Sequence, residues 1–184
     1  MANNGIRVLT NQPLHGGAAN MEANMPLDAV DDAQMLHAMH VGEPRPFTDA
    51  QDMLDRVAWH LFTQRVRSQT LVNDGRTVCA YRGNNGTMCA MGIGIPNDAY
   101  TRDMEEQSIE LVCSMDGARV FSRVIDDNTE LAAELQLSHD TMLTGGSEGI
   151  IDHLYGRLLH IAEDHRLDTT QLEAAYAHAR SVAR

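Results

Sequence analysis

The chain has 184 residues, 43% of them hydrophobic, and carries 26 acidic against 14 basic residues, for a formal net charge of −12. This length and apolar content suit one compact domain and exclude a chain that is disordered throughout. The negative charge disfavours direct nucleic-acid binding, which needs positive patches, and the absence of lysine excludes a Walker A lysine and lysine Schiff-base chemistry.

Cysteine usage and hydropathy predict a soluble protein of a reducing, intracellular compartment. Three cysteines are too few, and odd in number, for a disulfide framework. The first ten residues lack the apolar core of a signal peptide, and no apolar run reaches the roughly 18 residues that span a bilayer. We therefore expect no membrane association.

Residues 1–46 are predicted to form a flexible arm. Residues 1–24 are rich in Asn, Gly and Ala and show no sustained periodicity, and a short helix is predicted from Leu27 to Met39. The segment 42–46, Gly-Glu-Pro-Arg-Pro, then breaks the chain. A single helical domain is expected at 47–184.

The clearest amphipathic helix begins behind Thr48 and Gln51, which form a capping-box pattern, and runs to about Val66. Its apolar residues recur at spacings of three and four: Ala50, Met53, Leu54, Val57, Ala58, Leu61 and Phe62. Similar patterns predict helices at 108–115, from Asp127 or Asn128 to near Gly145, from Ser147 onward, and behind a capping box at 168–171.

One region is predicted to be β, a hairpin at about residues 77–92. Thr77–Tyr81 has strand composition, and the chain is expected to return through Thr87–Met91. Between them, Gly83-Asn84-Asn85-Gly86 supplies residues that tolerate the positive φ of tight turns. The predicted fold class is α+β and mainly α: a compact helical domain with one small antiparallel hairpin and a flexible N-terminal arm.

Four residues could supply a tetrahedral Zn²⁺ site: Cys79, Cys89, Cys113 and His139. Their spacings of ten, twenty-four and twenty-six lack the close cysteine pairs typical of zinc sites. Free cysteines are usually buried as small hydrophobic residues. The sequence therefore favours no cofactor, with Zn²⁺ as the alternative.

A nucleophilic trio could combine Cys79 or Cys89 with His139 and Asp140. Neighbouring residues on a helix point about 100° apart, so Asp140 is not expected to orient the adjacent imidazole. No local signature of a cysteine enzyme surrounds either cysteine. The sequence leans against an enzyme.

Tyr81 and Arg82 are the best candidates for recognition, because tyrosine and arginine are enriched at interface hot spots. On this hypothesis they form the tip of the hairpin. The alternative is that Arg82 pairs with a nearby acid such as Glu105. The sequence does not decide between the two interpretations. The candidate binding residues are Tyr81, Arg82, Glu105, His139 and Asp140.

Three segments carry a family resemblance. They are Cys79-Ala80-Tyr81-Arg82-Gly83, the Gly-Thr-Met-Cys-Ala-Met-Gly of 86–92, and the Ile-Pro-Asn-Asp-Ala-Tyr of 95–100; a late Leu-Gln-Leu-Ser-His-Asp at 135–140 joins them. Over residues 47–165 the pattern resembles a family of small, uncharacterised proteins encoded by tailed bacteriophages and prophages. Where that family has Met-Glu-Gly, this chain has Met104-Glu105-Glu106, so a glycine turn is replaced.

The resemblance and the acidic charge together predict a phage-encoded accessory protein that binds a protein partner, in host takeover or defence inhibition. One alternative is a virion structural or decoration component that uses the N-terminal arm. Another is a small Zn²⁺-binding protein or enzyme that uses the four metal candidates. The expected partner is a host or virion protein, and the expected location is the host cytoplasm or the virion.

Overall fold

The computed structural model describes residues 35, 37–72, 75–143 and 147–183. Most of the predicted arm, and all but the end of the predicted helix at 27–39, lies outside these residues. Met35 and His37–His40 are helical. Val41 and Phe47, which follow, are buried in the core.

Helix α2 (Ala50–Gln64) confirms the clearest prediction from periodicity, with a small correction at its start. Asp49, not Thr48, is the N-cap, and its carboxylate accepts the amide N–H of Asp52 at 2.8 Å. The Asp52 carboxylate in turn accepts the amide N–H of Thr48 at 3.0 Å. The pairing resembles a capping box but is not reciprocal, because Asp52 accepts the amide of the residue before the N-cap. Arg65 ends the helix in the left-handed conformation, with φ 54°.

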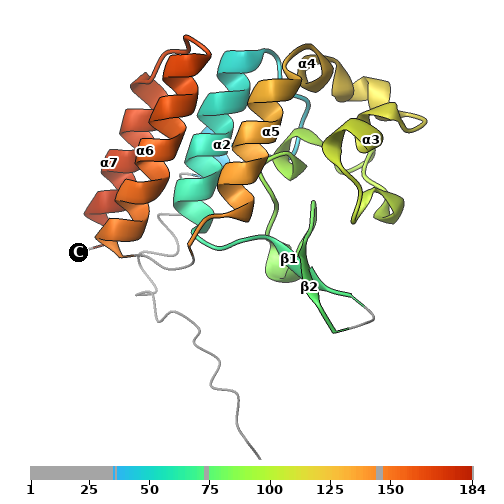
Figure 1. Ribbon diagram of the computed structural model, residues 1–184, viewed down its shortest axis with the longest axis horizontal. Helices are drawn as coiled ribbons and strands as arrows, with labels where there is room; N and C mark the ends of the chain where they lie inside the picture. Colours follow the sequence, from blue (N-terminus) through green and yellow to red (C-terminus); the bar gives the residue numbers. More distant parts are fainter. Residues whose placement is uncertain (1–34, 36, 73–74, 144–146, 184) are drawn as a thin grey trace, which may run out of the picture.

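Helices α5 (Thr129–Asp140), α6 (Glu148–Asp164) and α7 (Thr170–Ser181) pack with α2 into a bundle (Figure 1). Each contributes an apolar stripe to one shared core. Leucines at the centre of these stripes are completely buried: Leu54, Leu135, Leu158 and Leu172. Burial of this kind supplies most of the stability of short helices, because their intrinsic propensity is marginal in water.

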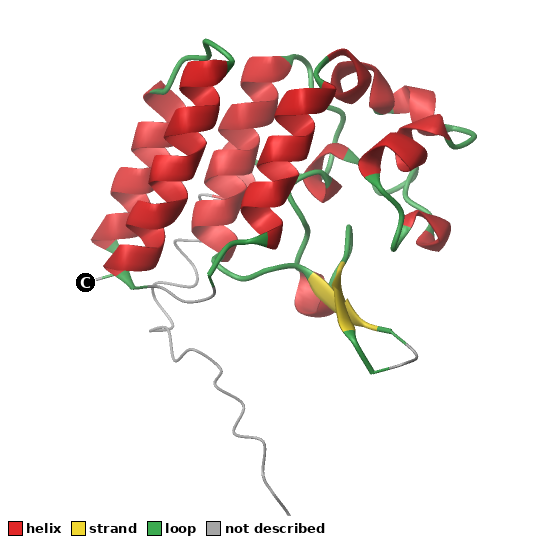
Figure 2. Cartoon of the chain, in the orientation of Figure 1, coloured by secondary structure: helices red, strands yellow, loops and turns green. Residues whose placement is uncertain are grey.

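The rest of the domain extends from the α5 side of the bundle (Figure 2). It contains α3 (Ile109–Ser114), α4 (Ser122–Asp127) and several 3₁₀ turns. It also holds one two-stranded antiparallel sheet of β1 (Gln69–Leu71) and β2 (Thr77–Cys79). The predicted class, mainly helical with one small hairpin, is confirmed. No helix in the described parts of the chain is long and apolar enough to cross a membrane.

The pairing within the hairpin differs from the prediction. Strand β2 pairs with the preceding β1, with Gln69 opposite Cys79, whereas the expected return segment at 87–91 makes one isolated bridge, between Arg82 and Met88. The predicted turn at 83–86 is present, with positive φ at Asn85 (58°) and Gly86 (75°).

Side chains of the bundle occupy the backbone groups that a longer strand pairing would use. His60 and Gln64 bind the carbonyl oxygen of Met88 at 2.8 and 2.9 Å, and Gln64 also accepts the Met88 amide. Gln136 accepts the amide of Met91 at 3.2 Å. The segment is thus fastened to α2 and α5 instead of to β2.

Candidate functional site

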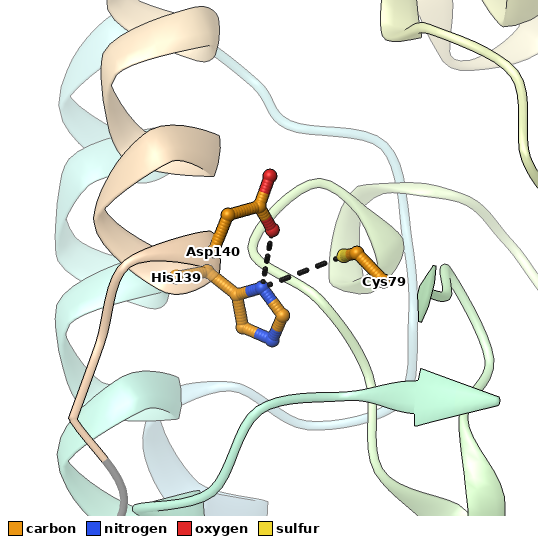
Figure 3. Close-up of side chains that lie close together, drawn as sticks. All are labelled: Cys79, His139 and Asp140. Atoms are coloured by element: carbon orange, nitrogen blue, oxygen red, sulfur yellow. Dashed lines mark hydrogen bonds and ion pairs between the residues drawn. The ribbon is translucent and has the colours of Figure 1, made fainter. Parts of the chain in front are cut away.

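Three potential ligand or catalytic side chains converge where β2 meets the last turn of α5 (Figure 3). The Sγ atom of Cys79 lies 3.6 Å from Nδ1 of His139, and Oδ1 of Asp140 lies 2.9 Å from the same nitrogen. All three atoms lie within 4.8 Å of one another. His139 has no solvent exposure, whereas Cys79 and Asp140 are partly exposed.

The contact between His139 and Asp140 corrects the expectation that neighbouring residues on a helix could not meet. Helix α5 ends at Asp140, and Thr141 after it leaves helical geometry, with ψ 1°. Nδ1 is the ring nitrogen nearer to the backbone, so a short side chain one residue away can reach it. Figure 3 shows the carboxylate turned toward this nitrogen.

Gln136 completes the arrangement and was missed by the sequence argument. Its Nε2 donates to Asp140 Oδ1 at 2.8 Å and to Cys79 Sγ at 3.3 Å. Because its Oε1 accepts the amide of Met91, the amide group has a defined orientation. The i,i+4 spacing of Gln136 and Asp140 on a predicted helix was the available signal.

The two ring nitrogens of His139 have different partners, which determines its tautomer. The amide N–H of Ser68 donates to Nε2 at 2.8 Å, so Nε2 carries no proton in this arrangement. The ring proton therefore sits on Nδ1 and is donated to Asp140. In a nucleophilic triad one nitrogen faces the nucleophile and the other faces the acid. Here one nitrogen faces both, so the geometry does not support Cys79 as an activated nucleophile.

The protonation states agree with this conclusion. The neighbouring Cys89 thiol, together with burial, raises the pKa of Cys79 well above its usual range, so Cys79 is a thiol. Burial favours a higher pKa for Asp140, but hydrogen bonds from His139 and Cys79 outweigh it, and the net pKa is lowered. The site thus combines a neutral thiol with an ionised carboxylate.

A pocket of about 570 Å³ opens beside the cluster, between β2, α3 and α5. Cys79, Cys89, Gln136 and Asp140 contribute polar atoms to its lining. The volume falls within the range of about 300–1,000 Å³ typical of small-ligand sites. The cluster is therefore reachable from one side of the domain.

The remaining metal candidates are divided between two places. Cys89 is buried and lines the same pocket as Cys79. Cys113 lies on α3 and interacts with Asp126 of α4; burial, followed by this acid, raises the pKa of Cys113 to about 12. Among the residues that the structure describes, the group with metal-ligand spacing consists of Cys79, His139 and Asp140. Two of the four predicted ligands, Cys89 and Cys113, lie outside this group, and Asp140, which was not among the four, belongs to it.

Glu105 organises a second cluster. Its carboxylate accepts the backbone amides of Tyr81 and Arg82, both at 2.9 Å, and the hydroxyl of Tyr100 at 2.8 Å. Tyr81 is only 7% exposed, and its hydroxyl donates to the carbonyl of Gln107 at 3.0 Å. These contacts hold the loops together.

The side chain of Arg82 also points into the protein. Its guanidinium donates to the carbonyl oxygens of Gly92 and Ile95, both at 2.5 Å, and lies over the ring of Tyr100 at 5.2 Å. The alternative of a local partner for Arg82 is thus closer to the structure, although that partner is backbone and not the Glu105 side chain. The exposed tip expected of Tyr81 and Arg82 is not formed.

No protein-family model, curated protein or solved structure matches the chain. The phage resemblance consequently stays an expectation drawn from the motifs.

Proposed function

We propose that the protein binds a transition-metal ion, Zn²⁺ in the first instance, through Cys79 Sγ, His139 Nδ1 and the Asp140 carboxylate. The observation that supports this is the convergence of the three atoms within 4.8 Å. Bonds of about 2.0–2.3 Å in a tetrahedral zinc site place its ligand atoms about 3.3–3.6 Å apart. The separation of 3.6 Å between Cys79 Sγ and His139 Nδ1 falls in this range, whereas the 2.9 Å between Nδ1 and Asp140 Oδ1 is about 0.4 Å shorter, so the carboxylate has to move slightly to admit an ion.

Metal binding requires a change of tautomer at His139. The proton on Nδ1 must move to Nε2, and the hydrogen bond from Ser68 is then lost. The Ser68 N–H and the new Nε2–H then face each other as two donors, and each unsatisfied donor costs about 1–3 kcal/mol. This cost lowers the affinity for the ion. The Cys79 thiol also has to lose its proton, and metal binding should therefore release protons.

Three protein ligands leave the fourth position of a tetrahedral ion for water or another ligand. Since Cys79 and Asp140 both line the pocket, an ion held between them borders it. Such a site resembles catalytic zinc centres in its ligand number, whereas structural centres are closed by four protein ligands. We do not require Cys89 as a ligand, because it lies outside the converging group.

The test is titration of reduced, chelator-treated full-length protein with Zn²⁺ by calorimetry and with Co²⁺ by visible absorption. We expect saturable 1:1 binding, a thiolate-to-Co²⁺ absorption band, and an enthalpy that changes with the buffer because protons are released. Cys79→Ser and Asp140→Asn should each weaken binding at least about tenfold, which corresponds to about 1.4 kcal/mol.

Cys113→Ser is the matched control, since it removes a buried thiol outside the cluster, and it should leave the affinity unchanged. Circular dichroism establishes that each variant is folded. The absence of saturable binding, or equal losses in Cys79→Ser and Cys113→Ser, would contradict the proposal.

A role in phage biology remains part of the proposal but has different support. The motif resemblance and the net charge of −12 favour a host or virion protein as partner. The internal use of Tyr81 and Arg82 removes the surface first assigned to that partner. Mass spectrometry of purified particles would separate a virion component from a protein confined to the host cytoplasm.

A further inference from the structure

The pocket beside the cluster has an apolar wall and an acidic rim. The wall is formed by side chains from β2, α3 and α5: Val78, Ile109, Ala133 and Leu137. The rim carries Glu106 and Glu110 in addition to Asp140, against one basic lining residue, Arg76. An apolar wall with an excess of carboxylates suits a group that is apolar along its length and positive at its end.

Part of the apolar wall is open to solvent. Leu137 on α5, one of the lining residues, is 52% exposed. Isolated exposed leucines are ordinary on protein surfaces. Here Leu137 belongs to the wall itself, so a ligand in the pocket would cover it.

Glu106 holds its carboxylate at the rim under unfavourable backbone geometry. Its φ is +64°, in the left-handed region, which costs a residue with a Cβ about 1–2 kcal/mol. The side chain is exposed, and among the described residues its carboxylate has no hydrogen-bond or ion-pair partner. Glu110 has the Ser108 hydroxyl as a neighbour; this hydrogen bond lowers the pKa of Glu110 and keeps it ionised. Two carboxylates are thus available to a ligand.

We propose that this pocket binds a basic segment of a partner polypeptide, with an arginine side chain inserted along the wall. The aliphatic stem would cover Ile109 and Leu137, and the guanidinium would meet Glu106 and Glu110. Arginine suits the site better than lysine because its planar fork can engage carboxylates through two hydrogen bonds. The volume of 570 Å³ exceeds one side chain, which leaves room for a flanking residue of the segment.

The charge distribution supports this partner class. A chain with a net charge of −12 attracts basic segments over a distance, and rim charges mainly speed association. The apolar wall then supplies contact that charge alone does not. The proposal does not require metal binding, because the guanidinium is assigned to Glu106 and Glu110, which are not in the converging group.

The test uses fluorescein-labelled Gly-Arg-Leu-Arg-Gly and its Lys and Glu counterparts, with fluorescence anisotropy of the full-length protein in chelator. We expect saturable binding of the Arg peptide, weaker binding of the Lys peptide and none of the Glu peptide. The double variant Glu106→Gln/Glu110→Gln should weaken binding about tenfold, and so should Leu137→Ser.

Glu130→Gln/Glu163→Gln is the matched control, because it removes the same charge from exposed positions outside the pocket lining. It should leave binding within about twofold of the unaltered protein. Equal losses in the two double variants would show general charge attraction and overturn the proposal, as would equal affinity for the Lys and Arg peptides. Because chelator is present throughout, failure here leaves the metal proposal standing, and absence of metal binding leaves this one standing.

Discussion

The bundle and the loop region, which consists of residues 65–72 and 75–107, are held together by different forces. In the bundle, completely buried leucines such as Leu54 and Leu158 meet across helices, and most of the stabilisation comes from apolar area removed from water. In the loop region, backbone amides of segments with little regular structure donate to single polar side chains, such as Glu105 within the region and Gln136, which reaches it from α5. The first kind of stability is spread over many contacts, and the second depends on a few side chains.

The candidate site lies where these regions meet. His139 belongs to a bundle helix, yet its ring accepts a hydrogen bond from Ser68 and contacts Cys79, both in the loop region. A rigid helix thus presents groups to a surface built from loops, an arrangement common to binding sites. The variants below test whether the two regions respond differently.

The largest effect is expected in the bundle core. Leu135→Ala removes a completely buried side chain and should lower the free energy of unfolding by about 3 kcal/mol, through lost burial and the cavity left behind. Chemical denaturation measures it. The control is Leu137→Ala, two residues along the same helix and 52% exposed, with an expected change within about 0.5 kcal/mol. Similar losses at both positions would contradict the description of α5 as a helix with one buried face.

The loop region should be sensitive to one carboxylate. Glu105→Gln keeps the size of the side chain but replaces an acceptor oxygen by an NH₂ group, which faces an N–H or O–H donor. Three hydrogen bonds converge on this carboxylate, so we expect a loss of about 2 kcal/mol. Glu163→Gln, on the exposed face of α6, makes the same chemical change and should alter the free energy of unfolding by less than about 0.5 kcal/mol. A tolerated Glu105→Gln would mean that apolar packing also holds the loops.

The comparison also explains what the sequence could predict. The bundle helices were identified because apolar residues repeat at helical spacing. Capping residues also indicated where three helices begin: Ser108 before α3, Ser147 before α6 and the 168–171 box before α7. The pairing of β2 was not predictable from composition. The backbone groups of Met88 that were expected to pair with β2 are bound instead by the side chains of His60 and Gln64 on α2, which is distant in the sequence.

For the site, Cys79, His139 and Asp140 were named together as a possible trio, but the sequence argued against contact between His139 and Asp140. His139 and Asp140 both lie in the last turn of α5, and their contact depends on the side-chain rotamers, which residue spacing does not reveal. Ser68 acts through its backbone amide, which no side-chain pattern can reveal. Tyr81 and Arg82 were chosen as surface residues because of their type, and their type serves equally well to satisfy buried carbonyls.

The contact between α2 of the bundle and the loop region should weaken as the pH falls. His60 on α2 donates from Nε2 to the carbonyl of Met88, and its Nδ1 accepts from His37 at 3.0 Å, so both nitrogens are engaged in the neutral ring. Burial lowers the pKa of His60 to about 3. An unfolded histidine protonates near pH 6.5, so below this pH the unfolded state binds more protons and stability is lost down to about pH 3.

Between pH 6.5 and 5 this one group should lower the free energy of unfolding by about 1.5 kcal/mol. Denaturation at both pH values, in the unaltered protein and in His60→Gln, isolates its share from that of other titrating groups. His160→Gln serves as the control, because His160 is largely exposed. A pH dependence that is identical in His60→Gln and the unaltered protein would rule out a neutral, buried His60 as its source.

The smallest expected effect has the opposite sign. Glu106→Gly relieves a left-handed backbone that costs about 1–2 kcal/mol, against an entropic penalty of about 0.5–1 kcal/mol for glycine, so a net gain of about 0.5 kcal/mol is expected. Glu110→Gly, in the first turn of α3, should instead lose up to about 1 kcal/mol. Both substitutions remove a carboxylate from the pocket rim, so both should weaken binding of the Arg peptide. If Glu106→Gly is more stable but binds the Arg peptide less well, Glu106 serves binding and not folding. If it is more stable and binds the peptide fully, the strained backbone at Glu106 has no role in binding.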